Sequence, residues 1–572
     1  MRNSTFKLFF IMCMLIASSA IAQQVTIDDI SLNELKIEGF NLKSKTEVSL
    51  VGSAGVFIED WQKMVFYGWI LNSDTRKVVW HMFDVIKKRD NYVDDGVFDF
   101  EEKITLEAGN YELMYAGMKD NNNNDHWDID SFDDFMNHLF SSRSRNRYND
   151  KYSDDLGMRV SASVLTKASP EELLMNKTKD AVVAINRVGD NRSYKEKFTL
   201  TKETTFRIYA IGEGSKEEVY DYVWIYDVEN HKKVWQMDYS NTNFAGGARK
   251  NYVVDKTITL PAGSFMVSYS SDDSHSFRRW NSLPPDDPQF WGVTMWVESP
   301  MDKANVTAFK ENNLTKPMVE LIRMGDEEYA SQGIKISVDT EVRVVCYGEK
   351  SDDGFVDYGW IVEANSRELV WEMTRSNSEY AGGSSKNRIS DNVINLEKGD
   401  YIVYYATDDS HSYRRWNASQ PYDPERYGIT LLATDKDVRY ELFDEDAYRS
   451  DKVLVDIIRV RDDEYLEKSF SLDKDTKLRI MALGEGGDDE MYDFGWIENR
   501  KTGKVVWEMT YRNTRYAGGA EKNRIFDDAI ILPKGDYKVY YETDGSHSYH
   551  DWNATPPRDQ ESYGISLLFD EK

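Results

Sequence analysis

The chain has 572 residues and is strongly acidic, with 100 Asp and Glu residues against 71 Lys and Arg residues and a formal charge of −29. This balance repels phosphate backbones and anionic lipids, so it argues against nucleic acid or a membrane surface as a partner. Because the chain contains only two cysteines, its folded part must be held together by packed cores and not by internal disulfides.

Residues 1–22 have the pattern of a secretory signal peptide. Two basic residues lie among the first seven, residues 8–16 are apolar, and Ala20 and Ala22 provide a small-residue cleavage site. Removing this segment would change the formal charge from −29 to −31. The apolar run is too short to span a bilayer and no later stretch is long enough, so we expect no membrane insertion. We therefore predict a secreted or periplasmic protein.

The rest of the chain is a tandem repeat. The stretch around His411, Asp408-Asp409-Ser410-His411-Ser412, has close copies 136 residues earlier, around His275, and 136 residues later, around His547. A period of this length indicates whole domains in series and not the short units of a solenoid. The predicted organisation is a signal peptide (1–22), repeat 1 (23–165), a linker (166–180), repeat 2 (181–298), a linker (299–316), repeat 3 (317–433), a linker (434–451) and repeat 4 (452–572).

Repeat 1 keeps the aromatic pattern of the other repeats and loses their polar residues. Trp69 and Trp80 are 11 residues apart, as are the matching tryptophans of repeat 2. However, Ser53 and Phe66 stand where the other repeats have Glu and Asp. The polar residues are therefore not required to form the fold.

An acidic insertion of repeat 1 replaces the Ser-His-Ser stretch. Asp120, Asn122 and Asn124 have the spacing with which a calcium loop begins, but Asp125 and Ser131 stand where an EF-hand needs Gly and Glu. The insertion is thus a candidate for a looser calcium site or for a solvated loop.

The first linker carries a helix-start pattern. Ser169 can act as the N-cap, Pro170 suits the first helical position, and Glu171 and Glu172 place acidic side chains in the first turn. We expect one or two helical turns here.

Repeats 2 to 4 read as series of short strands. In repeat 3, residues 334–336 alternate between apolar and polar, and an aromatic hairpin runs through Tyr358 and Trp360, which should share one strand face and enter a core. A strand, a Gly turn and another strand follow, and the last strand begins near Gly428. The absence of a long helical period predicts an all-β fold of four tandem antiparallel β-sandwiches, jelly-roll-like in type. Cys346, the one cysteine outside the signal peptide, is expected to be a small buried side chain because alanine occupies the matching positions.

The strand-turn-strand unit from Ile394 to Tyr401, which contains Gly399, resembles the closing hairpin of the pre-peptidase C-terminal type of jelly-roll domain of secreted bacterial proteins. The resemblance covers a small part of each repeat and does not include the Ser-His-Ser or Ala-Gly-Gly elements. It implies an accessory β-sandwich that binds calcium or a polymer.

A set of polar and aromatic residues recurs at the 136-residue spacing and forms the candidate ligand-binding site. The set consists of Glu213, Asp221, Lys250, Asp272, His275 and Trp280 in repeat 2, of Glu349, Asp357, Lys386, Asp408, His411 and Trp416 in repeat 3, and of Glu485, Asp493, Lys522, Asp544, His547 and Trp552 in repeat 4.

Two non-catalytic interpretations fit this set. In the structural one, the histidine caps a turn and Asp357 pairs with Lys386 or Arg323. In the binding one, the three carboxylates supply oxygen ligands to calcium, and Trp416 with Tyr413 offers a stacking face for a sugar. The Ala-Gly-Gly loop before Lys386 lacks the context of a phosphate loop, so we expect a tight turn there.

A catalytic interpretation would use His411 with Asp408 or Asp357 as a general base. No nucleophile motif accompanies the histidine, and three equal active sites in one chain are less expected than three binding sites that gain avidity. We therefore predict an exported, non-catalytic protein that binds an extracellular polymer or glycan through several weak sites. A hydrolase or lyase acting on a polysaccharide, with His275, His411 and His547 in its sites, and a purely structural envelope protein are the alternatives.

Overall fold

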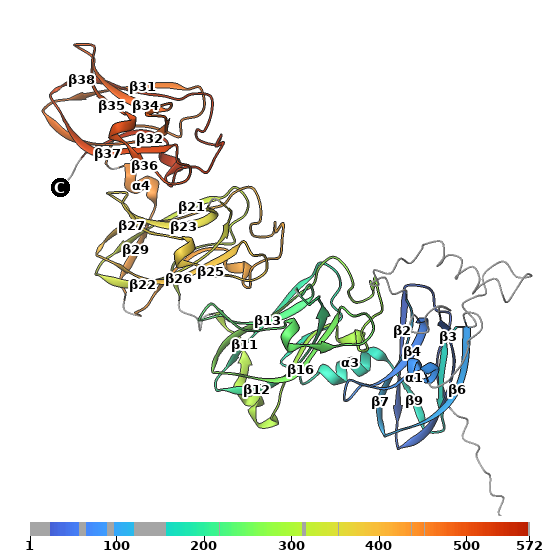
Figure 1. The fold of residues 1–572 in the computed structure, drawn as a ribbon. Coiled ribbons are helices and arrows are strands. Elements are labelled where there is room, and N and C mark those ends of the chain that lie inside the picture. Colours follow the sequence, from blue (N-terminus) through green and yellow to red (C-terminus); the bar gives the residue numbers. More distant parts are fainter. Residues whose placement is uncertain are drawn as a thin grey trace, which may run out of the picture. The chain divides into compact units, whose positions relative to one another are not determined.

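A computed structural model describes residues 23–56, 64–87, 97–118, 156–216, 218–311, 316–352, 354–435, 438–450 and 452–569. Contacts divide the chain into two compact units, Met1–Leu314 and Thr315–Lys572. The first holds repeats 1 and 2, and the second holds repeats 3 and 4. Several antiparallel sheets account for most of the described residues, which confirms the predicted all-β, multidomain sandwich fold (Figure 1). Among the described residues, no helix combines the length and the apolar character that a membrane crossing requires.

Repeat 1 forms a nine-stranded antiparallel sheet that folds onto itself, with the order β1-β8-β3-β4-β7-β2-β9 and with β5 and β6 paired to β4 and β3. Its elements are β1 (Gln23–Ile27), β2 (Glu34–Leu42), β3 (Thr46–Val56), β4 (Met64–Asn72), β5 (Lys77–His81), α1 (Met82–Lys87), β6 (Val97–Leu106), β7 (Gly109–Gly117), β8 (Met158–Ala162) and β9 (Leu165–Ala168).

Repeat 2 consists of two five-stranded sheets. One contains β10 (Val183–Ile185), β18 (Gly292–Val297), β12 (Thr204–Glu213), β16 (Asn251–Leu260) and β15 (Asn243–Phe244). The other contains β14 (Lys232–Gln236), β13 (Tyr222–Asp227), β17 (Gly263–Ser270), β11 (Ser193–Leu200) and β19 (Val306–Ala308).

Repeat 3 has the same two layers, which the pairing of β22 with β23 joins into one ten-stranded sheet. The first layer contains β20 (Pro317–Ile322), β28 (Gly428–Ala433), β22 (Thr340–Lys350), β26 (Asn387–Leu396) and β25 (Glu379–Tyr380). The second contains β24 (Leu369–Glu372), β23 (Phe355–Glu363), β27 (Gly399–Ala406), β21 (Tyr329–Ile336) and β29 (Tyr440–Phe443), and α4 (Glu445–Ser450) follows it.

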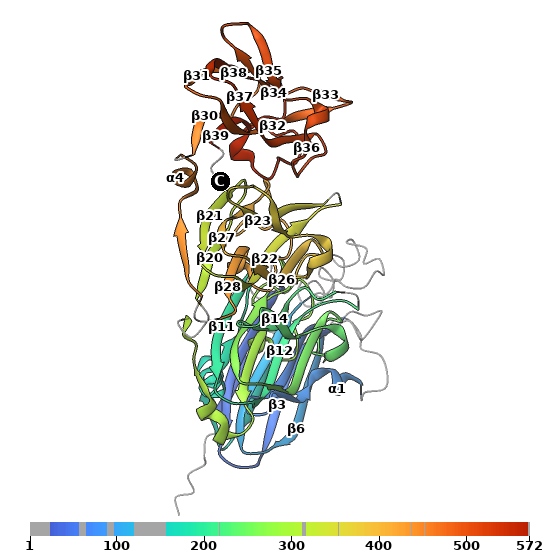
Figure 2. The same cartoon turned by 90° about the vertical axis from the view of Figure 1, so that its left-hand side faces the viewer.

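Repeat 4 has a six-stranded and a four-stranded sheet. The first contains β30 (Val453–Ile458) and β39 (Gly564–Phe569), which lie side by side (Figure 2), together with β32 (Thr476–Gly487), β37 (Asn523–Leu532), β36 (Arg515–Tyr516) and β33 (Glu490–Met491). The second contains β31 (Tyr465–Leu472), β38 (Gly535–Glu542), β34 (Phe494–Asn499) and β35 (Lys504–Glu508).

The linkers contribute structure that their composition does not indicate. The strands β9, β19 and β29 come from the segments predicted as linkers or their borders, and each pairs with the matching strand of the preceding repeat, β2, β11 or β21. The predicted helix is confirmed as α3 (Pro170–Thr178), with the side chain of Ser169 accepting from the backbone N–H of Glu172 at 3.1 Å. α3 lies between the strands of repeat 1 and those of repeat 2 (Figure 1).

The core of each sandwich follows the alternation of its strands. In β21, Ile334 and Ile336 are buried and Lys335 between them is exposed. Cys346 is fully buried, as predicted. A Cβ on Gly359 would touch Ile429 and the sulfur of Cys346, so it is Gly359 that faces the core.

The neighbours of Gly359 face the opposite way. Tyr358 and Trp360 share a strand face and belong to the buried hydrophobic cluster of repeat 3, as predicted, but they lie on the side of the sheet away from Gly359. They belong to the outer face of the sheet, where Trp360 stacks on Tyr404 with 5.3 Å between the ring centroids. Repeat 4 covers this face, because the hydroxyl of Tyr329 donates to the carbonyl of Arg558 at 3.2 Å.

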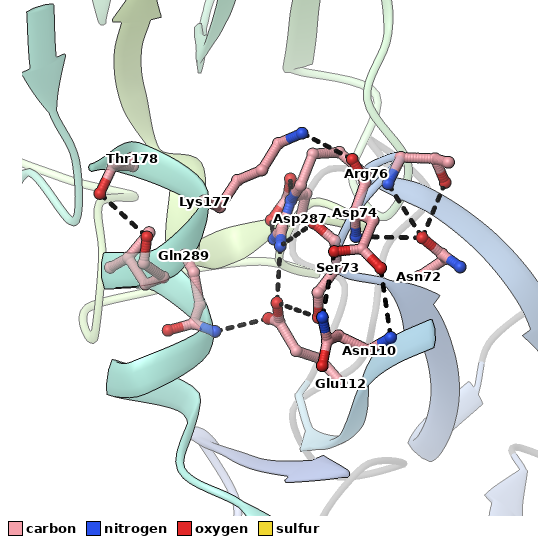
Figure 3. A network of polar contacts seen from close by, with 12 residues as sticks. Asn72, Ser73, Asp74, Arg76, Asn110, Glu112, Lys177, Thr178, Asp287 and Gln289 are labelled. Carbon is pink, nitrogen blue, oxygen red and sulfur yellow. Dashed lines mark hydrogen bonds and ion pairs between the residues drawn. The ribbon is translucent and has the colours of Figure 1, made fainter. Parts of the chain in front are cut away.

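The same docking joins repeats 1 and 2 in the first unit. The indole of Trp69 donates to the carbonyl of Asp286 at 2.7 Å. Beside it, Arg76 is enclosed between Glu112 of repeat 1 and Asp287 of repeat 2 (Figure 3). In the second unit, Arg367 pairs in the same way with Asp559. In both units, an arginine with a left-handed backbone conformation, Arg76 or Arg367, thus forms an ion pair with an aspartate of the following repeat.

Candidate functional site

The recurring acidic residues meet at one corner of each of repeats 2, 3 and 4. In repeat 2, β12 ends at Glu213 and Asp221 immediately precedes β13, and each of the two backbone N–H groups donates to the carbonyl of the other residue at 3.1 Å. Asp272 follows β17, and its N–H donates to Oδ1 of Asp221 at 2.8 Å. These contacts bring the three carboxylates together, although Asp272 is 51 residues from Asp221 in the chain.

These groups form three acidic clusters that could hold a metal ion, and we call each of them a carboxylate trio. In each trio, one oxygen from each residue lies within 4.8 Å of the others. The trios are Glu213, Asp221 and Asp272 in repeat 2, Glu349, Asp357 and Asp408 in repeat 3, and Glu485, Asp493 and Asp544 in repeat 4. The first two members are buried and the third is half-buried or exposed, so each trio opens to solvent on one side.

Each trio has more negative charge than its nearest lysine compensates. Nζ of Lys250 lies 2.8 Å from Oε1 of Glu213, and Lys386 and Lys522 contact Glu349 and Glu485 in the same way. The second oxygen of the glutamate, Oε2, is buried and has no hydrogen-bond partner among the described residues in any of the three copies. Three ionised carboxylates and one ammonium group would leave two negative charges, which a divalent cation would match.

Burial makes the carboxylates weak acids as long as the trio is empty. Burial is the main cause and the charge of Asp272 adds to it; together they raise the pKa of Glu213 to about 7 and that of Asp221 to about 8. In repeat 4, burial raises the pKa of Asp493 to about 7, and in repeat 3 it raises that of Asp357 well above the ordinary value. An empty trio therefore retains protons near neutral pH, and a bound cation would displace them.

The buried aspartate of each trio is held by an aromatic donor that the sequence analysis missed. Oδ2 of Asp221 accepts from the indole of Trp291 at 2.9 Å. The hydroxyl of Tyr427 takes this role for Asp357 at 2.6 Å, as does that of Tyr563 for Asp493 at 2.5 Å. An aromatic residue directly before the Gly of the last strand, repeated at the same period, was the signal available in the sequence.

The predicted pairing of Asp357 with a basic residue is wrong. Lys386 binds Glu349 instead, and Arg323 lies 2.9 Å from Glu425. Asp357 is fully buried, and within the described parts of the chain its carboxylate accepts from two uncharged donors, the N–H of Asp408 and the hydroxyl of Tyr427. Aromatic and backbone donors at a strand end can satisfy such a carboxylate without a second charge.

The histidine lies behind the trio and is closed off from solvent. His275 is fully buried, and its Nε2 lies 2.7 Å from Oδ1 of Asn251. Its Nδ1 lies 2.9 Å from Oδ1 of Asn281, which also accepts from Lys250. Burial lowers the pKa of His275 to about 3, so the ring is neutral at physiological pH. His411 and His547 are equally buried, and all three adopt a left-handed backbone conformation.

The asparagine next to the histidine ties two loops together. Nδ2 of Asn251 donates to the carbonyl of Gly246 at 2.8 Å and to that of Leu283 at 3.0 Å. The expected tight turn is present at the Ala-Gly-Gly element, because Gly247 has a φ of +65° and a Cβ there would lie 1.9 Å from the carbonyl oxygen of Pro284. Histidine and asparagine thus fix the loop that carries the docking residues Asp286 and Asp287.

The tryptophan of the set shields the histidine and does not offer a free stacking face. Trp416 is half-buried, and its ring lies edge-on to His411 and to Tyr427, each at 5.0 Å between centroids. Tyr413 is half-buried under the guanidinium group of Arg414, 5.0 Å away. The structure therefore brings all the predicted site residues together, but it leaves only one side of the carboxylate trio open.

Repeat 1 has no carboxylate at the three positions that match the trio. Ser53, Phe66 and Met118 occupy the three positions, and their strands still form the sandwich. The candidate calcium residues Asp120, Asn122 and Asn124 lie outside the described residues, as does the predicted signal peptide.

No family model matches the chain, and no curated protein matches it. Among solved structures, the chain is similar to a structure of the CBM32-1, CBM32-2 and M60 catalytic domains of ZmpB from Clostridium perfringens, with 9% sequence identity and a TM-score of 0.13. The match covers 67% of this chain and 53% of the other, so the chain spans about half the length of that protein. A likeness this weak carries no argument about function. The resemblance to pre-peptidase C-terminal domains stays a prediction.

Proposed function

We propose that this chain is an exported, non-catalytic binding protein that takes up a divalent cation, calcium by preference, at one equivalent site in each of three repeats. It would bind an extracellular polymer or glycan through several weak binding sites at once. The observation that carries the cation sites is the buried Oε2 of Glu213, Glu349 and Glu485, which has no hydrogen-bond partner among the described residues in any copy.

Calcium suits the trios for reasons of charge and of ligand type. It takes six to eight oxygen ligands in flexible geometry, whereas magnesium demands a tighter octahedron. Each trio offers carboxylate oxygens only, from strand ends and a loop, and opens to solvent, from which water can complete the shell. At the matching positions, Ser53 and Phe66 of repeat 1 supply no carboxylate, so this corner of repeat 1 serves as an internal control.

The burial of the histidines supports a non-catalytic role. A hydrolase or lyase built on His275, His411 and His547 would need an imidazole that reaches its substrate, and each of these rings is fully buried. Incubation with neutral polysaccharides and measurement of new reducing ends tests this alternative, and product release that is lost in His411→Asn would favour it.

The test of the cation sites is a calorimetric titration of the chelator-treated protein with calcium. We expect three ions per chain, falling to two in Glu349→Gln. Glu341→Gln is the matched control, because Glu341 lies exposed on the same strand and should leave three. At a calcium concentration 100-fold above the Kd, each site should stabilise its repeat by about 2.7 kcal/mol. No uptake, or uptake that Glu349→Gln does not change, would leave the trios as structural features and refute the proposal.

A further inference from the structure

Within the second unit, the docking of repeat 4 on repeat 3 leaves a crevice beside the outer aromatic face. The contact itself is made by the hydroxyl of Tyr329 on the carbonyl of Arg558, and by Arg558 on Glu372 with an N···O distance of 2.8 Å. The crevice has a volume of about 900 Å³, which is in the range of sites for small molecules and short oligomers. Both repeats line it, principally through Tyr329, Tyr358, Trp360, Asp408, Trp552 and Pro556.

An unsatisfied donor lies in the wall of this crevice. The indole N–H of Trp360 has no hydrogen-bond partner among the described residues, although the residue is only 2% exposed. In the first unit, the matching indole of Trp69 donates to the carbonyl of Asp286. A buried donor without a partner costs free energy, so the crevice favours an occupant that brings an acceptor to Trp360.

The polar groups around the crevice select the charge of that occupant. Five carboxylates line it, those of Glu327, Glu328, Asp408, Asp409 and Glu561, and none of its described lining residues is Lys or Arg. Anionic ligands are therefore repelled. Glu327 and Asp409 are exposed and can accept hydrogen bonds from hydroxyl groups, while Tyr329, Trp552 and Pro556 supply apolar surface.

The crevice between repeats 1 and 2 provides a comparison within the same chain. It is smaller, about 470 Å³, and it is also lined by a tryptophan with an unpaired indole N–H, Trp280. However, Leu35 replaces the tyrosine, and Arg187 and Arg278 bring positive charge. The combination of an aromatic floor, an unsatisfied donor and purely acidic charge is thus a property of the crevice in the second unit.

We propose that this crevice binds a neutral oligosaccharide. The Trp360 indole donates to a sugar oxygen, the carboxylates of Glu327 and Asp409 accept from hydroxyl groups, and the ring of Tyr329 packs against the apolar face of a pyranose. The inference rests on the proposed role in polymer binding, for which it names a site, and it does not depend on the cation sites.

The experiment is a calorimetric titration of the full mature chain with hexasaccharides of neutral glucan, xylan and mannan, of polygalacturonate as the anionic probe, and with hexalysine as the cationic one. We expect at least one neutral hexasaccharide to bind and polygalacturonate not to bind. Trp360→Phe removes the donor and should weaken binding about fivefold to tenfold, while Tyr329→Leu, which copies repeat 1, should weaken it at least about tenfold. Trp496→Phe makes the same chemical change at the matching position of repeat 4, outside the crevice, and should have no effect.

Several outcomes would overturn the inference. They are no binding of any neutral hexasaccharide, an equal loss in Trp360→Phe and Trp496→Phe, or binding of hexalysine alone, which would assign the crevice to a cationic peptide. Asp409→Asn, an exposed change that cannot disturb the core, should weaken binding about threefold and keeps the test valid if a ring substitution unfolds the repeat. A calcium titration of the same samples shows whether the cation sites bind calcium independently of whether the crevice binds an oligosaccharide.

Discussion

Replacing Arg76 by glycine should loosen the joint between repeats 1 and 2. The guanidinium group donates to Glu112 with an N···O distance of 2.6 Å and to Oδ2 of Asp287 at 2.8 Å, and the three side chains are almost completely buried (Figure 3). Glycine occupies the matching turn position of repeat 4, Gly503, so the substitution preserves a backbone that the fold already accepts.

The cost follows from what Arg76→Gly leaves behind. Removing one partner of a buried ion pair leaves an uncompensated charge, which costs about 3–5 kcal/mol. Glycine should recover about 1 kcal/mol of this, because Arg76 has a φ of +59°. Burial already raises the pKa of Asp287, and losing Arg76 removes an interaction that lowers it. A carboxyl with a raised folded pKa loses stability as pH rises, so the deficit should be smaller at pH 5 than at pH 8.

Differential scanning calorimetry of the mature chain measures this loss. Lys45→Ala, which breaks an exposed pair with Glu107, is the control and should change little. In Arg76→Gly with Asp287→Asn, the deficit should be less than the sum of the two single deficits, because the two groups act together. A deficit below about 1 kcal/mol, or one independent of pH, would refute the view that a buried charge cluster joins these repeats.

Three further predictions concern pH, backbone and thiol. The calcium-free protein should lose stability from pH 6.5 to 8, because native Glu213 and Asp221 hold protons up to pKa values of about 7 and 8 and the same residues in the unfolded chain do not. With saturating calcium, the melting temperature should not fall over this pH range. An equal fall with and without calcium would contradict the prediction. Gly383→Ala should cost more than 2–3 kcal/mol in guanidinium unfolding, because its Cβ would lie 2.0 Å from a carbonyl oxygen, whereas Gly503→Ala, with nothing within 4 Å, should cost about 1 kcal/mol. Cys346 is fully buried and burial raises the pKa of its thiol, so an aromatic disulfide reagent should label it only upon unfolding, and rapid labelling of the native protein would disagree.

Much of the fold and the grouping of the candidate site could be predicted from the sequence, because both depend on local periods. Alternation in β21 indicated which side chains enter the core, and the 136-residue spacing identified the residues that form the trios. The proximity of Glu213 and Asp221 also follows from one strand ending and the next one beginning nearby. These inferences need only strand geometry and a comparison of the chain with itself.

The contacts between repeats could not be predicted in this way. Arg76 meets Asp287 across 211 positions of sequence, and nothing local to either residue indicates the other. Tyr358 and Trp360 are buried as predicted, but the sequence does not indicate that repeat 4 covers their face of the sheet, because burial by a neighbouring domain demands the same apolar side chains as burial in a core. The strand β29, Tyr440–Phe443, is only four residues long and is flanked by Arg439 and Asp444 in a stretch rich in charged residues, so composition assigned it to a linker.

The residue seven positions after the hairpin tryptophan shows which side chains the turn requires and which the contact with the next repeat requires. It is Arg76, His231, Arg367 and Gly503 in repeats 1 to 4, and all four have a left-handed φ between +51° and +63°. Glycine satisfies such a turn at the lowest cost, so the turn alone does not explain arginine. In both positions where arginine stands, it reaches the matching aspartate of the next repeat, Asp287 or Asp559. The backbone strain at these two arginines is therefore offset by their ion pairs with the next repeat. An arginine at this position thus indicates that a repeat forms an ion pair with the repeat that follows it.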